Sequence, residues 1–590
     1  MKNFLKYTLA SIVGFLIANL ILFFIFIGII ASVVASSKDK TVKVKPKTVL
    51  HIKLDKPIVD RASNNPLDNF NFGDIESSYK LGLYDVLQNI EKAKTDENIK
   101  GIYLELFVIP AGIATIDEIR NALIDFKESG KFIISYSDYY TQSAYYLASV
   151  ADKVYLNPEG TFDFKGLRAE IMFIKGSLKK LGIEPQIIRH GKYKAAVEPF
   201  ILDKMSDANR EQTSKYVNSI WEHYIKGIST QRDISTDKLS EYADNYKLIV
   251  SEDLIDKKLI DGLKYKDEVL AELRDLLEID AKKEINSISL NKYTKAPKKH
   301  KQKGLAKDKV AVIFAQGLIQ MGKGKEDVIG SERISKAIRE ARLDSTIKAI
   351  VLRINSGGGS ALASDIILRE IILAKQVKPV IASMGNVAAS GGYYIACAAD
   401  TIVASDVTIT GSIGVLGIIP NAKELLNDKL GITFDGVKTN KFSDFIGIDR
   451  PMRPEEKEII LEMIENVYDV FITHVSNGRN MTKEAIDEIG QGRVWSGTDA
   501  KEIGLIDVFG GLNKSIEIAV EKAGLEKYRV VSLPKQEDPF EQIMKQLTGD
   551  VKTAILKEQL GAQYKYYEKI QKFSKIKGIQ AIMPYEIDVY

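Results

Sequence analysis

The sequence repeats one pattern twice, and this duplication limits the fold more than any other feature. A shift of 248 residues aligns YYLA at 145–148 with YYIA at 393–396. With a slip of one residue, LGI at 181–183 aligns with LGI at 430–432. Solenoid repeats run about 20–50 residues, so copies this far apart are duplicated domains. We expect the two domains to pack side by side, as two subunits of a homo-oligomer pack.

The two copies differ at two positions that carry chemistry. The second copy has Ser390 where the first has Gln142, and the first has Lys194 where the second has Ser443. A serine–lysine pair therefore needs one residue from each copy. This complementary difference predicts a single site built between the two domains.

Composition indicates a large globular protein and argues against several functions. The 590 residues exceed the ~100–200 expected for one domain, and 45% apolar residues can fill sizeable cores. A net charge of +4 gives no support for nucleic-acid binding. The single cysteine, Cys397, excludes an intramolecular disulfide, and its apolar helical surroundings indicate a buried thiol. The five histidines lack ligand spacing, so we expect no metal site.

The N-terminus predicts a membrane anchor. Residues 9–35 are apolar except at three positions, and a helix of 27 residues spans ~40 Å, more than the ~30 Å hydrocarbon core. A cleavable signal peptide has an apolar core of only ~7–15 residues, so an uncleaved single-pass anchor is favoured, with SVVASS at 32–37 as the alternative cleavage site. Two lysines precede the span and five follow it within residues 38–47, a balance that favours a cytoplasmic body.

The chain divides into five segments. They are an anchor (1–37), a first repeat (48–294), a basic linker (295–308), a second repeat (309–533) and an amphipathic helical tail (534–590) to which we assign no chemistry. In both repeats short apolar strands alternate with amphipathic helices, which is typical of βαβ units with covered, mostly parallel sheets. The predicted fold class is therefore α/β. The lysine-rich linker is interpreted as solvated.

A glycine-rich loop follows one strand of the second repeat. In NSGGGSALASD at 355–365 a strand runs into Gly357–Gly359 and then into a helix. Three glycines free the backbone to expose N–H groups to a ligand, although a tight strand-to-helix turn would explain them as well. The loop lacks the Gly-Lys-Ser/Thr ending of a phosphate loop.

Ser390 lies one βαβ unit further on, after a strand and at the start of a helix. It is either a helix N-cap or a nucleophile. A helix N-terminus favours developing negative charge, and Gly391 lets a substrate carbonyl approach the backbone. Because both loops follow the carboxyl ends of strands, we expect them to line one crevice.

A serine hydroxyl needs a base at neutral pH, and Lys194 is the candidate. No histidine recurs at a suitable place, and His190 is interpreted as surface or structural. Lys194 precedes the apolar residues Ala195, Ala196 and Val197. Lowering a lysine pKa from ~10.4 to ~7–8 takes ~4 kcal/mol of desolvation and dipole effects, so we place it in a dry cleft between the domains.

Four separated motifs resemble those of signal peptide peptidase A in its long tandem form, in peptidase family S49. The motifs are NSGGGSALASD, MGNVAASGGYYIA, TGSIGVLG and YKAAVEPF, and the likeness covers the chain from the membrane span to its last residues. The resemblance implies crotonase-like (Clp-protease-like) domains in both copies. It implies that Ser390 is the nucleophile, Lys194 the general base, Ser412 a hydroxyl that hydrogen-bonds the lysine, and Gly359 and Gly391 the oxyanion amides.

The resemblance also implies a biological setting. Members of the family are anchored in the bacterial inner membrane, hold the catalytic body outside the cytoplasm, form homotetramers and degrade released signal peptides. We therefore expect a periplasmic body, against the charge balance, and peptide substrates with no cofactor. The family's usual proline is replaced by Gly357, which removes no donor because proline has no N–H.

Two other functions stay open at this point. An acyl-CoA-processing crotonase relative would direct glycine amides at a thioester oxyanion, but would need neither the split pair nor an anchor. A non-enzymatic membrane scaffold would have no reason to retain both Ser390 and Lys194.

Overall fold

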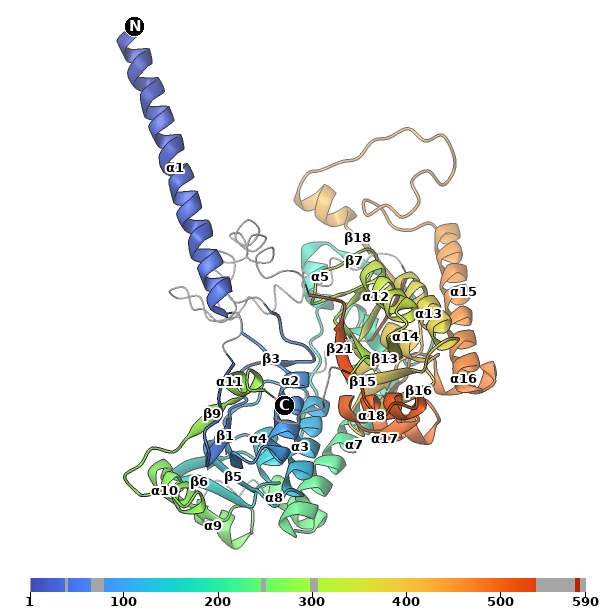
Figure 1. The fold of residues 1–590 in the computed structure, drawn as a ribbon. Coiled ribbons are helices and arrows are strands. Elements are labelled where there is room, and N and C mark those ends of the chain that lie inside the picture. Colours follow the sequence, from blue (N-terminus) through green and yellow to red (C-terminus); the bar gives the residue numbers. More distant parts are fainter. Residues whose placement is uncertain are drawn as a thin grey trace.

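The computed structural model describes residues 2–37, 41–64, 79–245, 251–297, 306–536 and 579–583. Figure 1 shows two halves that follow the duplication, with the first repeat in blue to green and the second in yellow to red. The two halves lie side by side, and the long helix α1 (Lys2–Ser37) leads away from them.

The first repeat is built on a parallel six-stranded sheet of order β8-β6-β5-β4-β1-β9. Its strands are β1 (Thr48–Ile52), β4 (Ile99–Glu105), β5 (Phe132–Tyr140), β6 (Lys153–Phe162), β8 (Gly262–Leu263) and β9 (Ser287–Ser289). Its longer helices are α2 (Leu83–Thr95), α3 (Ile113–Lys127), α7 (Asp207–Arg232), α8 (Thr236–Asn245) and α10 (Lys266–Leu276), and α4 (Gln142–Ala148) follows β5. Along β4, Ile102 and Leu104 belong to one apolar cluster and Tyr103 to another, so the sheet is covered on both faces, as predicted.

The second repeat has a mostly parallel sheet of order β19-β17-β15-β13-β10-β21, in which β19 is antiparallel to β17 and β16 and β20 are attached through β15. Its strands are β10 (Lys309–Gln316), β13 (Ile347–Ser356), β15 (Val380–Ala389), β16 (Thr401–Ala404), β17 (Ile409–Gly411), β19 (Val494–Ser496), β20 (Val508–Phe509) and β21 (Arg529–Leu533). Its helices are α12 (Ser331–Leu343), α13 (Ala361–Lys375), α14 (Gly391–Ala396), α15 (Pro454–Arg479), α16 (Lys483–Ile489), α17 (Gly497–Glu502) and α18 (Leu512–Lys522). Along β10, Val310 and Val312 pack into the core shared with the first repeat, whereas Ala311 and Ile313 pack into a core of the second.

Matching side-chain contacts confirm that the two copies share one fold. The hydroxyl of Tyr146 donates to Asp117 at 2.8 Å, and the hydroxyl of Tyr394 donates to Asp365 at 3.0 Å. Both residues of the second pair lie 248 positions after those of the first. The repeat seen in the sequence is therefore a repeat of contacts as well as of elements.

A third sheet joins the two repeats, with the order β12-β11-β14-β22-β18-β7. Four of its strands come from the second repeat: β11 (Ile319–Gln320), β12 (Ile329–Gly330), β14 (Gly358–Ser360) and β18 (Leu416–Asn421). The first repeat contributes β7 (Glu184–Arg189), which pairs antiparallel with β18. Figure 1 shows β7 and α5 (Lys175–Leu181) beside β18, away from the sheet of their own repeat. A strand of the first repeat thus forms one edge of a sheet that belongs mainly to the second repeat.

Buried ion pairs also hold the repeats together. The guanidinium of Arg353 in β13 donates to Asp60 at 2.7 Å and to Glu118 at 2.6 Å. All three side chains are at most 5% exposed. Both carboxylates come from the first repeat and the guanidinium comes from the second. The two repeats therefore meet through a buried charged contact as well as through apolar packing.

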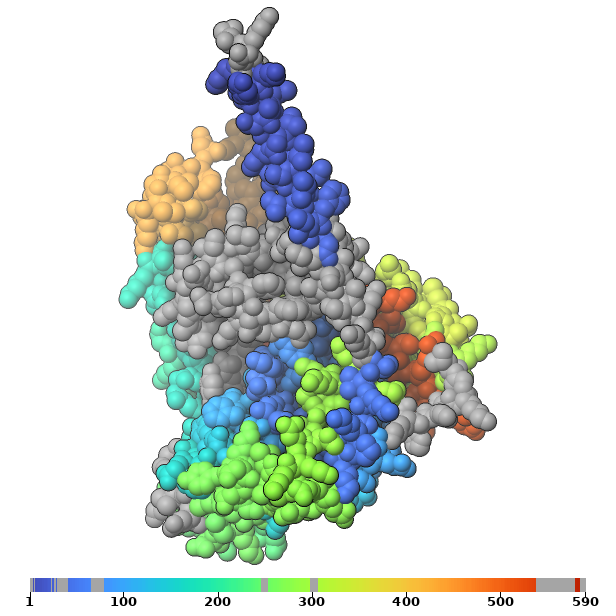
Figure 2. Space-filling model, turned by 60° about the vertical axis from the view of Figure 1, so that its left-hand side comes forward, coloured from blue at the N-terminus to red at the C-terminus, as the bar shows by residue number. Residues whose placement is uncertain are grey.

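The two ends of the chain were predicted to be an apolar anchor helix and a helical tail. Apolar side chains along α1 are exposed, among them Phe15 and Leu16, and Figure 2 shows the helix projecting from the rest of the molecule. Within the part of the chain that is described, no helix has the length and apolar character of a membrane span. In the predicted helical tail (534–590), residues 537–578 and 584–590 lie outside the described residues, and 580–582 form a strand, β22 (Gln580–Ile582), in place of a helix.

Candidate active site

Ser390 and Lys194, one from each repeat, meet in the interior of the molecule. Nζ of Lys194 lies 2.8 Å from Oγ of Ser390, and both side chains are fully buried. The same Nζ lies 3.1 Å from Oγ of Ser412 and 3.0 Å from its carbonyl oxygen. The structure thus brings together the three polar residues that the sequence and the resemblance singled out.

The path of β7 explains how Lys194 reaches the second repeat. Strand β7 ends at Arg189, which pairs with Leu416, and the next residue, His190, donates its N–H to the carbonyl of Val415. A tight turn at Gly191 then points the chain inward, and the guanidinium of Arg189 donates to the carbonyl of Lys194 at 3.0 Å. Lys194 is therefore positioned by backbone pairing across the repeats.

Ser390 has a strained backbone at the end of β15. Its φ of 54° and ψ of −115° lie in a region that residues with a side chain rarely adopt. It occupies the N-cap position of α14, but its side chain makes no capping hydrogen bond. The hydroxyl of Ser390 therefore does not cap the helix and instead contacts Lys194.

Burial controls the charge of Lys194. Desolvation lowers the pKa of its ammonium well below the usual value, and no carboxylate contributes to the shift in the opposite direction. A lysine with a lowered pKa can be neutral near pH 7 and can accept a proton. The arrangement has the chemical requirements of a general base beside a hydroxyl nucleophile.

Two glycines that the sequence analysis did not single out make room for the lysine. A methyl group at Gly492 would lie 2.6 Å from Cβ of Lys194, and one at Gly414 would lie 3.2 Å from its Cδ. Gly492 also has a φ of 82°, which favours glycine. These residues form a slot for the side chain, and Gln491 next to them accepts the N–H of Tyr193 at 3.0 Å. The slot is visible only in the folded structure, where Gly414 and Gly492 contact Lys194.

The two glycines expected to supply oxyanion amides lie in segments that approach each other. Gly391 follows Ser390 at the start of α14, and Gly359 lies in β14. A methyl group at Gly358 would lie 2.7 Å from the nitrogen of Gly391, so the glycine loop closely approaches that amide. Gly359 has a φ of 151° and its missing side chain leaves room for Ile319. The structure thus brings the loop that contains Gly359 close to the amide of Gly391.

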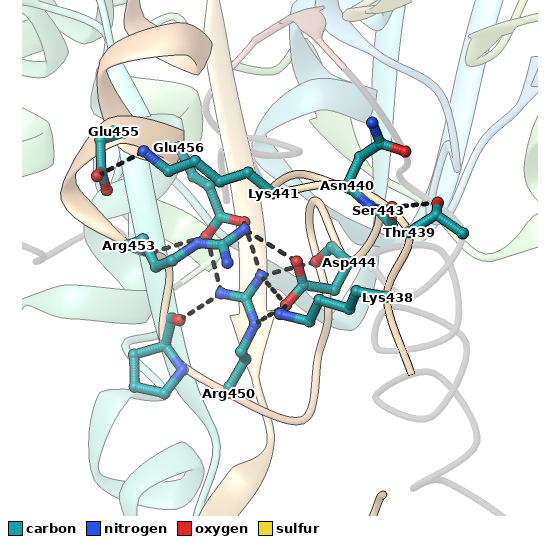
Figure 3. Close-up of polar contacts among 11 residues, drawn as sticks. Lys438, Thr439, Asn440, Lys441, Ser443, Asp444, Arg450, Arg453, Glu455 and Glu456 are labelled. Carbon is teal, nitrogen blue, oxygen red and sulfur yellow. Dashed lines mark hydrogen bonds and ion pairs between the residues drawn. The ribbon is translucent and has the colours of Figure 1, made fainter. Parts of the chain in front are cut away.

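The residues at the corresponding positions of the opposite copies have structural contacts. Oε1 of Gln142 accepts the backbone N–H groups of Lys165 and Gly166. Ser443 is exposed, and its Oγ accepts the N–H of Asn440 (Figure 3). Neither contact resembles the buried pair, so only one Ser–Lys site is formed among the described residues.

The remaining candidates behave as expected of structural groups. The ring of His190 stacks on Tyr468 with centroids 4.1 Å apart. The thiol of Cys397 is buried, and burial raises its pKa to about 12. No group of three or more potential metal ligands occurs within the described residues.

Comparisons with known proteins bear on this arrangement. The sequence model of peptidase family S49 matches twice, over residues 125–280 and 372–526. Protease 4 from Salmonella typhi is 37% identical over 521 residues, which is 86% of this chain and 83% of that protein. The chloroplastic serine protease SPPA of Arabidopsis thaliana is 35% identical over 477 residues, or 80% of this chain and 70% of that protein. ClpP1 from Listeria monocytogenes aligns with a TM-score of 0.22 and 18% identity over 34% of this chain and 91% of its own, a likeness too small to carry an argument.

The duplicated α/β fold and these matches define a serine protease. The chain belongs to peptidase family S49, and each repeat carries one of the two family segments.

Proposed function

We propose that the protein is an endopeptidase in which Ser390 is the nucleophile and Lys194 the general base. The observation that carries the proposal is the 2.8 Å contact between Nζ and Oγ, made between two fully buried side chains from different repeats. A surface lysine would stay protonated at neutral pH, whereas a desolvated one with a lowered pKa can take the serine proton.

The reaction follows from the contacts around Lys194. Neutral Nζ takes the proton of the Ser390 hydroxyl while Oγ adds to a peptide carbonyl. The amides of Gly359 and Gly391 stabilise the oxyanion, and each such donor contributes about 3–4 kcal/mol in other hydrolases. The ammonium then protonates the leaving amine, and a water activated by the same nitrogen hydrolyses the ester. The hydroxyl and carbonyl of Ser412 keep Nζ aimed at the nucleophile.

Released signal peptides and other hydrophobic peptides are the proposed substrates. Support comes from the resemblance of the motifs and from the apolar residues beside the lysine, which include Val197, Leu416 and Ile418. An extended peptide that passes Ser390 would pair through its backbone with the chain near the glycine-rich loop.

A pair of substrates separates this proposal from its rivals. The wild-type enzyme should hydrolyse a hydrophobic peptide ester, and a fluorophosphonate probe should label Ser390. The Ser390→Ala variant should lose both properties. Faster turnover of an acyl-CoA thioester than of any peptide would favour the crotonase alternative, and failure of the probe to label folded protein would favour a scaffold.

We further propose that residues 1–37 anchor the protein in the bacterial inner membrane with the catalytic body in the periplasm. The support is the 27-residue apolar run at 9–35 and the resemblance, against a lysine balance that favours the other orientation. Protease added to intact spheroplasts should digest the body while cytoplasmic markers survive. Full protection until lysis would reverse the orientation.

Four chains are proposed to assemble head to tail into a closed ring. Inside one chain, the first turn of α3 packs against the second repeat, where Thr115 donates its N–H to Asn386 and Asp117 accepts from Ser405. The corresponding turn of α13 is open, with Leu362 61% exposed and Asp365 half exposed. A neighbouring first repeat would cover it in the same way.

Light scattering tests the ring. The protein in detergent should have the protein mass of four chains, and Leu362→Lys should lower that mass to one chain. Val377→Lys, at an equally exposed site after α13, is the matched control and should leave the tetramer intact. A wild-type mass of one chain at micromolar concentration would contradict the ring.

A further inference from the structure

The side chain of Gln212 fastens the lysine turn (residues 190–194) to the second repeat. Gln212 belongs to the first repeat, lies in the second turn of α7 and is 2% exposed. Its Nε2 donates to the carbonyl of Tyr193 at 3.2 Å, and its Oε1 accepts the N–H of Val494 in β19 at 3.0 Å. One amide side chain therefore joins the residue before Lys194 to a strand of the other repeat.

Neighbouring side chains hold this amide in one orientation. A backbone carbonyl can only accept and a backbone N–H can only donate, so only a side chain with both functions can bridge the two. Asn209 accepts the second N–H of Gln212 at 3.1 Å, and its own Nδ2 donates to the buried carboxylate of Glu198 at 2.9 Å. Both N–H groups and the oxygen of the Gln212 amide are thus bonded, and such a satisfied buried network is rigid.

The contacted strand, β19, also holds the backbone of the residues that Lys194 meets. Val494 pairs with Gly411 in β17, and the carbonyl of Gly411 accepts the N–H of Ser390 at 2.8 Å. The carbonyl of the preceding residue, 493, accepts the N–H of Ser412 at 2.6 Å. A shift of the lysine turn relative to β19 would therefore change the distance from Nζ to both serine hydroxyls.

Further contacts fix α7 along β19 and the start of α17. Nζ of Lys215 lies 3.1 Å from Asp499, and the hydroxyl of Ser219 donates to Ser496 at 3.0 Å. Residues 212, 215 and 219 share one face of the helix because they are three and four positions apart. Gln212 is therefore presented by an element that is itself held against the second repeat.

We propose that Gln212 is a positioning residue, which sets the reach of Lys194 toward Ser390 and Ser412. The inference rests on the proposed function of this site. Gln212 acts through the backbone of Tyr193 and transfers no proton itself. Loss of the amide frees the lysine turn, and a misplacement of about 1 Å costs about 100-fold in rate.

The test compares two buried glutamines in the full-length enzyme. Gln212→Met keeps an unbranched side chain of similar size and removes its hydrogen bonds. Gln142→Met does the same to a glutamine whose oxygen accepts two backbone N–H groups of the first repeat. On a fluorogenic hydrophobic peptide ester, kcat of Gln212→Met should fall by about 10- to 100-fold with KM nearly unchanged, whereas Gln142→Met should keep both constants within about twofold.

The pH profile separates positioning from a general loss of stability. A loosened turn lets water reach Nζ of Lys194, so part of the desolvation that lowers its pKa is lost. The pH at which kcat/KM is half-maximal should therefore be higher in Gln212→Met than in wild type, and unchanged in Gln142→Met. The charged and titratable side chains that form or contact the turn are the same in all three enzymes: Arg189, His190, Lys192, Tyr193, Glu211 and Arg493.

A second variant covers the case in which Gln212→Met does not fold. Gln212→Glu keeps the oxygen that accepts the N–H of Val494 but cannot donate to Tyr193. Its kcat should also fall and its pH midpoint should also rise. A Gln212→Glu enzyme with the kcat and pH midpoint of wild type would show that the bond to Tyr193 does not position the lysine.

The remaining outcomes separate this inference from the proposed function. If activity depends on Ser390 and Lys194 but Gln212→Met behaves like Gln142→Met, the positioning role is wrong and the proposed function stands. If Ser390→Ala or Lys194→Met keeps full activity, the proposed function is wrong and the positioning role is lost with it.

Discussion

Two corresponding segments of the repeats differ completely in their surroundings. The lysine segment (residues 182–201) enters the second repeat, where Ile188 is 5% exposed and Lys194 is fully buried. The counterpart segment (residues 431–450) carries Ser443 at the corresponding position and is largely exposed, with Val437 fully exposed. The same place in a duplicated fold thus yields a buried base in one copy and a solvated loop in the other.

The difference arises from what each segment can pack against. The lysine segment has β18 and the slot at Gly414 and Gly492. The counterpart segment is held by ion pairs of its own. Arg450 donates to Asp444 at 3.2 Å and to Glu456 at 2.6 Å, as Figure 3 shows. Packing between the repeats therefore provides the desolvation that lowers the lysine pKa, and duplication alone does not.

The largest expected effect is on the dyad itself. Ser390→Ala and Lys194→Met should each lower kcat/KM for a peptide ester by about 10,000-fold or more, since nucleophile and base act as a unit. Ser443→Ala, at the corresponding position of the counterpart segment, should stay within twofold of wild type. A Lys194→Met enzyme with near-normal activity at pH 7 would show that another group is the base.

The second largest effect is expected at the slot that holds the lysine. Gly492→Ala would place a methyl group 2.6 Å from Cβ of Lys194, and displacing the amine by about 1 Å costs about 100-fold in rate. Gly436→Ala in the counterpart segment meets no atom within 4 Å and should have no effect. Equal activity of the two variants in the peptide ester assay would mean that the slot does not position the lysine.

Much of this arrangement could be predicted from the sequence. The alternation of strands and helices and the complementary loss of Ser390 and Lys194 predict two α/β copies with one shared site, because those signals repeat along the chain. The slot could not be predicted, since Gly492 and Lys194 are almost 300 residues apart and only packing relates them. The strand β22 was missed for a related reason: three residues give no periodicity, and its pairing is set by the gap between β14 and β18.

Burial of corresponding side chains gives a third test. Ile188→Ser removes apolar contacts from a core and should lower the free energy of unfolding by about 2–5 kcal/mol. Val437→Ser changes a fully exposed residue and should alter it by less than about 0.5 kcal/mol. Denaturant unfolding of the two variants in parallel measures the difference. Similar losses for both would show that the counterpart segment is packed in solution.

The smallest and most specific effect concerns pH, and the two segments predict different behaviour. Hydrogen bonds from Arg450 lower the pKa of Glu456, which follows the counterpart segment, to about 2, so this carboxylate stays charged between pH 5 and 9. Desolvation lowers the pKa of Lys194, and the base must be neutral to act, so kcat/KM should fall about tenfold for each pH unit below that pKa.

The lowered pKa of Lys194 also makes the stability of the fold depend on pH. Because the pKa of Lys194 is lowered in the folded state, that state binds fewer protons than the unfolded state. The free-energy cost of burying Lys194 therefore grows as pH falls from about 10.5 toward the folded pKa. Lys194→Met should therefore be more stable than wild type at pH 7, and its advantage should shrink by about 1.4 kcal/mol for each pH unit gained above the folded pKa. Unfolding of both proteins from pH 6 to 10 measures this. A constant difference across that range, together with a flat activity profile, would mean that Lys194 does not titrate and that the lysine segment brings no working base to Ser390.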